Sequence, residues 1–201
     1  MMKISAKSGA KIGAFGAAAL LVLAATPALA HVGHHPTNGF LAGLTHPPTG
    51  LDHLLAMLAV GLWAGIVGGR AAWGWPAAFV AAMTAAALYG MVGPWLPGVE
   101  LAIAGSVLAL GLAVALRLSA PLVVGAAACG AFALAHGYAH GAELPLGAGA
   151  AGYVAGFVLA TAALHAVGVL AGRLMARDLP LWATRGAGGV VAAMGVLLLV
   201  G

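Results

Sequence analysis

The sequence predicts an all-α integral membrane protein, a six-helix transmembrane bundle that follows a cleavable signal peptide. Two properties of the 201-residue chain indicate this fold. Hydrophobic residues make up 63% of the chain and charged residues 6%, whereas about a quarter of the residues in a soluble domain are charged. Several apolar stretches also approach the roughly 20 residues with which a helix crosses about 30 Å of hydrocarbon.

Residues 1–30 have the pattern of a secretory signal peptide. A leader with all three lysines of the chain precedes the apolar run 12–25, and Ala28-Leu29-Ala30 supplies a small-x-small cleavage site. We expect cleavage after Ala30, which leaves residues 31–201 as a single transmembrane domain; an uncleaved first helix is the alternative. Because the lysines belong to the leader, the pI near 9.7 does not indicate nucleic-acid binding.

Six apolar segments of the mature chain are predicted to span the membrane. They are joined by short connections, which favours one compact bundle. A short apolar run before the first span, residues 39–45, is predicted to enter the membrane as a broken or re-entrant half-helix. The predicted spans are 49–68, 72–92, 97–116, 121–140, 146–172 and 179–200.

The arginines predict the orientation of the bundle. If the mature N-terminus is periplasmic, every arginine falls on the cytoplasmic side, as the positive-inside rule requires. We therefore expect a multi-pass protein of the bacterial inner membrane. The arginines are Arg70, Arg117, Arg173, Arg177 and Arg185.

Glycine is abundant, with 32 residues. Small residues four apart let helix backbones approach closely in lipid, so we interpret these glycines as packing residues. The spaced pairs are Gly61/Gly65, Gly65/Gly69, Gly152/Gly156 and Gly168/Gly172.

A helix break is predicted just before the first span. Pro47 and Pro48 should prevent a helix from running through, because proline lacks the backbone donor and clashes with the preceding turn. Thr49 and Asp52 have the spacing of a capping box, with Gly50 between them, and are predicted to start the span. Irregular backbone at membrane depth is tolerated where it lines a cavity, so a substrate site is expected here.

Three potential metal ligands flank this break: His46, Asp52 and His53. Ionisable side chains are costly inside a membrane unless they are paired or hydrated. Capping alone would explain Asp52, but it needs no imidazole, so three potential ligands within eight residues favour a metal site.

A second group of potential ligands, His136, His140 and Glu143, lies near the end of the fourth span. At 100° per residue these positions project within an arc of about 60° if the helix continues that far. The alternative is that these residues form an amphipathic helix end whose side chains extend to water. Gly141 and Pro145 favour this alternative, because they place Glu143 in the turn.

The predicted topology places both groups on the periplasmic side, where they can share one site. Up to four imidazoles and two carboxylates would meet there, and such N and O donors suit nickel, cobalt or zinc. Cys129 is the single cysteine of the chain, so a thiolate-rich site is excluded. The predicted metal residues are His46, Asp52, His53, His136, His140 and Glu143.

Four further histidines have weaker claims to a metal. His165 lies in the inner half of the fifth span, where it could relay metal inward or could simply bond to a neighbour such as Thr161. His31, His34 and His35 begin the predicted mature chain and could capture metal from the periplasm.

These motifs resemble those of the HupE/UreJ family of hydrogenase and urease accessory proteins, regarded as nickel permeases. The family signature H-P-x-x-G-x-D-H-x-x-A-M corresponds to residues 46–57, and H-x-x-x-H-G-x-E corresponds to residues 136–143. The resemblance spans essentially the whole chain. It implies nickel transport, and it implies that the six predicted metal residues handle the metal.

The mature chain has no lysine and no phosphate-binding G-x-x-x-x-G-K-[ST] motif, so ATP hydrolysis through that motif is excluded. We therefore expect a secondary transporter rather than an enzyme. Its transported substrate is Ni²⁺ or Co²⁺, and we expect no permanently bound cofactor. Its partners are this ion and the lipid bilayer; the sequence indicates no oligomeric state. A non-transporting metal chaperone and an intramembrane zinc-dependent hydrolase are the alternatives.

Overall fold

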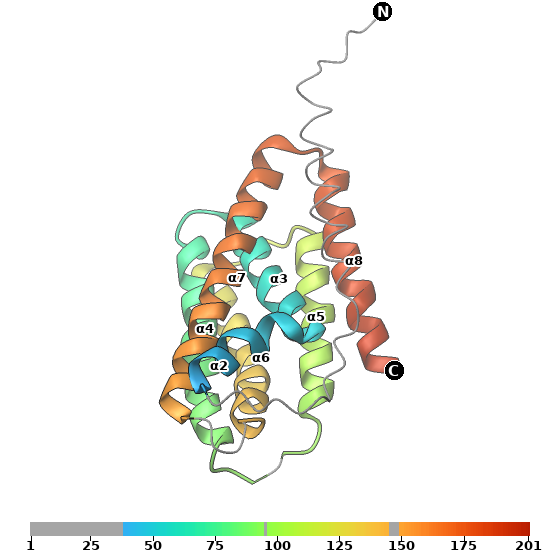
Figure 1. Ribbon diagram of the computed structural model, residues 1–201. Coiled ribbons are helices and arrows are strands. Elements are labelled where there is room, and N and C mark those ends of the chain that lie inside the picture. The colour runs from blue at the N-terminus through green and yellow to red at the C-terminus, as the bar shows by residue number, and fades with distance from the viewer. Residues whose placement is uncertain (1–37, 95, 145–148) are drawn as a thin grey trace, which may run out of the picture. The chain divides into compact units, whose positions relative to one another are not determined.

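A computed structural model describes residues 38–94, 96–144 and 149–201, and within these residues the chain is helical, with no strand (Figure 1). The predicted signal peptide, 1–30, and the three histidines that follow it lie outside the described residues. The helices are α2 (Gly39–Thr49), α3 (Leu51–Val67), α4 (Ala71–Gly90), α5 (Val99–Ala115), α6 (Leu122–Ala142), α7 (Ala150–Asp178) and α8 (Leu181–Val200).

The helices match a multi-pass membrane protein. Among the described residues α4, α6, α7 and α8 are long and apolar enough to cross a bilayer, and α2 with α3 forms a fifth candidate bent by 78°. The α5 helix is apolar but has only 17 residues. Helices therefore occur at all six predicted positions, but by length and composition they give four to five candidate spans rather than six.

The bundle consists of closely packed helix pairs. The most extensive contacts join α4 to α6, α5 to α8, and α7 to both α2 and α3, while α3 also contacts α4 and α5 (Figure 1). Large apolar side chains such as Val60, Trp75, Phe79 and Met83 are fully buried between them. The α3 helix thus lies inside the bundle, and its N-terminal end reaches the polar residues described below.

Glycines bring α3 and α7 together. A Cβ atom added to Gly61 or Gly65 on α3, or to Gly168 or Gly172 on α7, would overlap backbone atoms of the opposite helix. This confirms the predicted packing role for these residues. Gly69 is different, because it lies in the α3–α4 turn with φ +53° and a Cβ there would meet nothing within 4 Å.

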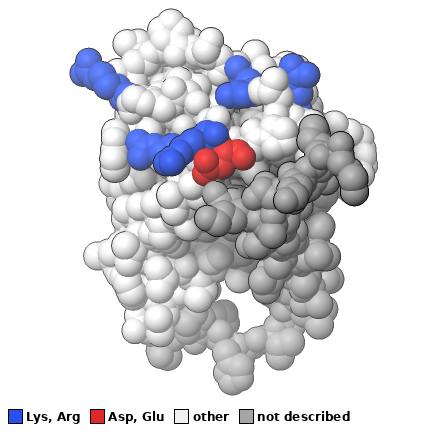
Figure 2. Space-filling model, turned by 90° about the horizontal axis from the view of Figure 1, so that it is seen from above, with Lys and Arg blue, Asp and Glu red and all other residues white. Residues whose placement is uncertain are grey.

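The arginines gather at the end of the bundle where α3 joins α4, α5 joins α6 and α7 joins α8 (Figures 1 and 2). Two tryptophans brace this end. The indole N–H of Trp63 donates to the carbonyl oxygen of Leu118 at 2.7 Å, and that of Trp75 donates to the carbonyl oxygen of Leu122 at 3.0 Å. The two indole rings lie 4.4 Å apart, so α3, α4 and the α5–α6 connection are held together.

The helix break occurs at Gly50, later than predicted. Pro47 and Pro48 lie inside the last turn of α2, where the helical φ that the proline ring imposes is compatible with the fold despite the missing amide hydrogen bonds. The capping-box prediction is wrong: Gly50 caps α3 without a side-chain bond, and the Thr49 hydroxyl donates back to the carbonyl oxygen of His46 at 2.8 Å. Asp52 makes a different contact, described next.

Candidate metal site

Asp52 binds the histidine that follows it. Its Oδ1 accepts from the backbone N–H of His53 at 2.7 Å and lies 2.8 Å from Nδ1 of the same residue. A carboxylate can only accept, so Nδ1 carries the proton and Nε2 keeps its lone pair. The His53 side chain is buried, and Nε2 has no hydrogen-bond partner among the described residues.

Gly50 makes room for this pair. Its backbone is extended, with φ −83° and ψ 117°, a conformation that any residue adopts. A Cβ at this position would lie 3.0 Å from Oδ1 of Asp52 and 3.1 Å from Nδ1 of His53. The absence of a side chain therefore leaves the Asp52–His53 hydrogen bond undisturbed at the bend.

The α6 helix contributes two fully buried histidines, His136 and His140. Each is followed by a glycine, Gly137 or Gly141, whose added Cβ would overlap the α4 backbone at Met83 or Ala87. This close packing fixes the rotation of α6 about its axis. The helix ends at Ala142, two residues beyond the predicted span, and Glu143 is its C-terminal cap, as the alternative for this helix end placed it.

Ser106 on α5 orients His136. The Ser106 hydroxyl donates to the carbonyl oxygen of Ile103 at 2.7 Å and lies 2.8 Å from Nε2 of His136. A hydroxyl has one hydrogen, so its oxygen accepts from Nε2–H and the lone pair of His136 is on Nδ1. Within the described chain this buried Nδ1 has no partner.

The two histidine motifs meet in one cluster, which we call the imidazole cluster and define as His46, His53, His136 and His140. The ring centroid of His140 lies 4.9 Å from that of His46 and 4.5 Å from that of His53, and His53 lies 5.0 Å from His136. The rings thus form a chain that starts at His46 and ends at His136.

The chain of rings runs from an open end to a buried end. At the open end Nε2 of His46 lies 3.0 Å from Oε2 of Glu143, and these side chains are 33% and 47% exposed. His53 is 7% exposed, and His136 and His140 are 0% exposed. All six predicted metal residues therefore belong to one connected group of polar side chains.

The imidazole nitrogen atoms of the cluster do not converge on one point. Among the described residues no three His, Cys, Asp or Glu side chains are arranged so that they could hold one metal ion. At the same time His53 Nε2, His136 Nδ1 and both nitrogens of His140 are buried and unpartnered there. Leaving such groups unpaired costs about 1–3 kcal/mol each, which is a physical reason to expect a ligand.

Aromatic side chains enclose the cluster. Phe157 on α7 stacks on His140, with centroids 5.3 Å apart and an interplanar angle of 13°. Tyr153, also on α7, lies 6.1 Å from His46, and Phe79 on α4 lies 5.7 Å from His136. These contacts cover the imidazoles on the α4 and α7 sides.

Sequence reasoning did not find Ser106 or the aromatic residues. Ser106 had a weak signal, because a polar residue inside an apolar span usually bonds across helices. Tyr153 and Phe157 are spaced like ordinary core residues on α7, so only the packing of α7 against α2 and the contact of Phe157 with His140 identify them as part of the site. His165 is not part of the cluster and contacts Phe79, with ring centroids 5.0 Å apart.

Comparison with known proteins gives a consistent result. The family model described as HupE / UreJ protein matches residues 19–198. A curated relative named Protein HupE, from Rhizobium leguminosarum bv. viciae, is 49% identical over 172 residues, which cover 86% of this chain and 90% of the relative. No solved structure matches the chain.

Proposed function

This chain belongs to the HupE/UreJ family, and on that basis we propose that it is a secondary transporter that imports a divalent transition metal. Ni²⁺ is the proposed substrate and Co²⁺ its nearest competitor, supplied to urease or hydrogenase maturation. We further propose six spans in the bacterial inner membrane, with the mature N-terminus in the periplasm after removal of the signal peptide. The gathering of the arginines at one end of the bundle supports this orientation.

The observation that carries the proposal is the imidazole cluster itself. Four imidazole rings in succession lead from a half-exposed carboxylate to the buried interior of an otherwise apolar bundle. Intramembrane ionisable residues usually mark an ion pathway. Imidazole and carboxylate without thiolate suit Ni²⁺, which also accepts water in a six-coordinate shell.

Two residues of the site are proposed to orient ligands. Asp52 holds the proton of His53 on Nδ1, and Ser106 holds the proton of His136 on Nε2. Each leaves the other nitrogen of the ring free for the ion. Partners of this kind fix ligand tautomer and orientation in many metal sites.

The ligands must move slightly to bind. Since no three of them converge on one point in the described residues, we propose that the ion draws His53, His136 and His140 together after it passes the His46–Glu143 pair. An incompletely assembled site binds more weakly, and weak binding allows release. A divalent ion that moves down 100 mV gains about 4.6 kcal/mol, so the membrane potential is a sufficient driving force.

The test is Ni²⁺ uptake by proteoliposomes that contain the mature protein, under an inside-negative potential. Accumulation should follow the potential and should fall by at least about tenfold in His53→Ala and His136→Ala. Leu134→Ala serves as a matched control, because Leu134 is an exposed residue of α6 two positions before His136. Competition with Co²⁺ and Zn²⁺ measures the metal preference.

Other outcomes would identify the alternatives. Tight Ni²⁺ binding without accumulation would indicate a metal chaperone rather than a transporter. Metal-dependent hydrolysis of lipid or peptide by the purified protein would indicate an enzyme. Unchanged uptake in both histidine variants, at equal protein in the membrane, would refute the proposed role of the cluster.

A further inference from the structure

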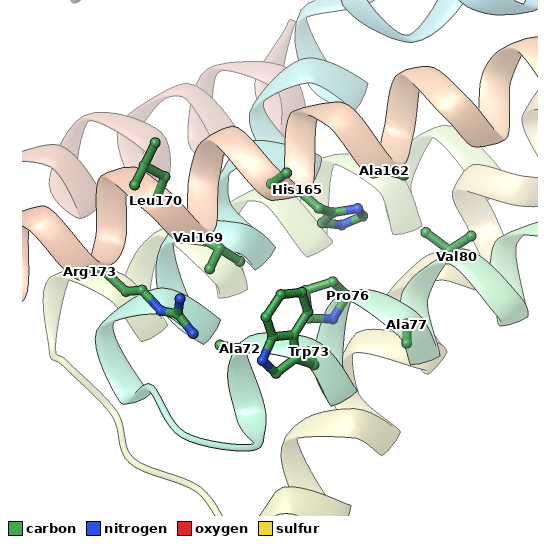
Figure 3. Close-up of a pocket in the computed structure, with 11 residues that line it drawn as sticks. Ala72, Trp73, Pro76, Ala77, Val80, Ala162, His165, Val169, Leu170 and Arg173 are labelled. Carbon is green, nitrogen blue, oxygen red and sulfur yellow. The ribbon is translucent and has the colours of Figure 1, made fainter.

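A groove between α4 and α7, which we call the α4–α7 groove, opens on the outer surface of the bundle. It has a volume of about 470 Å³, and its lining comes from residues 72–80 of α4 and residues 162–173 of α7 (Figure 3). Ala77 and Ala166, in its two walls, are exposed. In a multi-pass membrane protein the surroundings of such an opening are the acyl chains of lipid.

The walls of the groove are almost wholly apolar. Alanine, valine, leucine and proline side chains make up most of the lining, and no described carboxylate belongs to it. His165 lies in the wall, but it is 2% exposed and packs against Phe79, with ring centroids 5.0 Å apart. Walls of this kind favour an apolar occupant over water or an ion. They therefore fit a hydrocarbon chain.

Arg173 supplies a positive charge at one end of the groove. Its Cζ lies 5.8 Å from the ring centroid of Trp73, so the indole holds the guanidinium beside the opening (Figure 3). Arg177 pairs with Asp178 at 3.5 Å, whereas Arg173 forms no salt bridge with a described carboxylate. Its donors are therefore available for a phosphate, which a guanidinium binds through two parallel hydrogen bonds.

The length of the groove matches one leaflet of a bilayer. From Ala162 to Arg173 the α7 helix rises about 16 Å, and half of a 30 Å hydrocarbon core is about 15 Å. Trp73, at the same end as Arg173, is 72% exposed, and exposed tryptophans of membrane proteins are enriched at the level of the headgroups. An acyl chain along the groove would therefore have its headgroup beside Arg173.

We propose that the α4–α7 groove binds one anionic phospholipid from the leaflet at the arginine end of the bundle, with an acyl chain in the groove and the phosphate on Arg173. Charge complementarity selects the headgroup, because a cation without a protein partner stands where the headgroup lies. Basic pockets between transmembrane helices bind anionic headgroups in this way. The site is separate from the imidazole cluster and does not depend on the transported ion.

The lipid would join two helices that the protein itself connects only weakly. The α4 helix packs mainly on α6, and α7 packs mainly on α2 and α3. A ligand that binds the folded state and not the unfolded state raises the free energy of unfolding. Anionic phospholipid should therefore stabilise the bundle more than zwitterionic phospholipid does.

The first test compares headgroups by thermal unfolding of the purified mature protein in detergent. Phosphatidylglycerol should raise the midpoint by at least about 5 °C more than phosphatidylcholine with the same acyl chains. Arg173→Gln should reduce this difference to below about 2 °C. Arg185→Gln is the matched control and should keep the difference, because Arg185 lies on α8 and outside the groove. Inorganic phosphate should not replace the lipid, since it cannot fill the groove.

The second test locates the acyl chain. Phosphatidylglycerol with a photoactivatable diazirine near the end of one chain should cross-link to the walls of the groove, as mapped by peptide mass spectrometry. Ala166→Phe fills the groove and should reduce this cross-linking by at least about fivefold. Val190→Phe, at an exposed position of α8, should not reduce it. His165→Leu keeps an apolar wall and should leave the cross-linking unchanged.

Several outcomes would overturn the proposal. Equal stabilisation by the two lipids, or equal loss of the preference in Arg173→Gln and Arg185→Gln, would show that no specific headgroup site exists. Stabilisation by inorganic phosphate alone would show a simple anion site. Cross-links spread evenly over the exposed faces of α7 and α8 would indicate ordinary boundary lipid. A dimer that Ala166→Phe dissociates would place a second copy of the chain in the groove.

Discussion

Ser106 on α5 holds His136 on α6 through a hydrogen bond of 2.8 Å while its own proton goes to the carbonyl oxygen of Ile103. The serine hydroxyl has only one proton. Because that proton goes to Ile103, the hydroxyl oxygen accepts the N–H of His136. The consequence is that the lone pair of His136 is on its buried Nδ1, which has no partner among the described residues. A helix that supplies none of the predicted ligands therefore sets the chemistry of one of them.

Loss of the Ser106 hydroxyl should weaken metal binding. Ser106→Ala leaves His136 free to exchange tautomers, and we expect Ni²⁺ affinity to fall by about 10- to 100-fold. Ser106→Thr keeps the hydroxyl and should restore most of the affinity. The visible absorption spectrum of bound Co²⁺ is the second readout, because a change in ligand orientation alters it. An unchanged affinity and spectrum in Ser106→Ala would show that the serine only packs.

The negative charge of Asp52 should strengthen metal binding by His53. Asp52→Asn keeps the shape of the side chain but removes the negative charge that stabilises the Nδ1–H of His53, so affinity should fall by about 10- to 100-fold. Asp178→Asn is the matched control, since Asp178 pairs with Arg177 at 3.5 Å at the opposite end of the bundle. Calorimetric titration of both purified variants with Ni²⁺ measures the difference. Equal losses in the two variants would contradict a specific role.

Gly50→Ala should affect metal binding more than stability. An alanine fits the backbone conformation of Gly50, so the free energy of unfolding should change by less than about 1 kcal/mol. Its Cβ would crowd Oδ1 of Asp52 and Nδ1 of His53, so Ni²⁺ affinity should drop by about tenfold. Thermal unfolding in detergent and metal titration check the two parts. A large loss of stability with affinity intact would mean that the glycine serves only the bend.

Close packing of α6 on α4 should make Gly137 intolerant of a side chain. A Cβ there would overlap the Met83 carbonyl group, so Gly137→Ala should destabilise the protein by about 1–3 kcal/mol. Gly105→Ala on α5 is the control, because a Cβ at that position meets nothing within 4 Å; alanine should be neutral or slightly stabilising there. Midpoints of thermal unfolding compare the variants, and equal midpoints would contradict the described packing.

The half-exposed Glu143 should act on the rate of entry. Glu143→Gln removes a negative charge beside His46 at the open end of the cluster, so the KM for Ni²⁺ uptake should rise several-fold with little change in maximal rate. The dependence of uptake on ionic strength should also weaken. Glu100→Gln, in the first turn of α5, serves for comparison. A fall in maximal rate with KM unchanged would indicate that Glu143 acts after entry.

Hydropathy and motif spacing predicted much of this molecule. Apolar runs located five helices to within two residues, because the requirement for internal backbone hydrogen bonds in lipid leaves helix as the solution, whereas α7 continues to Asp178, six residues beyond its predicted end. The spacing of His136 and His140 predicted two residues on one helical face. The number of spans was harder, since α3 and α5 have only 17 residues each and length alone cannot decide whether such helices cross.

The details of the site depend on contacts between helices. Pro47 and Pro48 are usual helix breakers, yet α2 continues through them and turns at Gly50, where the Asp52–His53 pair needs space. Ser106 lies 30 residues from His136 in the sequence, so no local pattern connects them. Such a contact follows only from how α5 and α6 pack.

The indole hydrogen bonds of Trp63 and Trp75 make the arginine end of the bundle a rigid part of the molecule. Parting α3 and α4 from the α5–α6 connection would break both hydrogen bonds at once, and the contact between the two indole rings ties α3 to α4. The α7 helix is not held by these bonds, and it meets α3 across bare glycine backbone. In the proposed transport cycle we therefore expect α7 and α2 to move together against α3, while the arginine end of the bundle stays fixed.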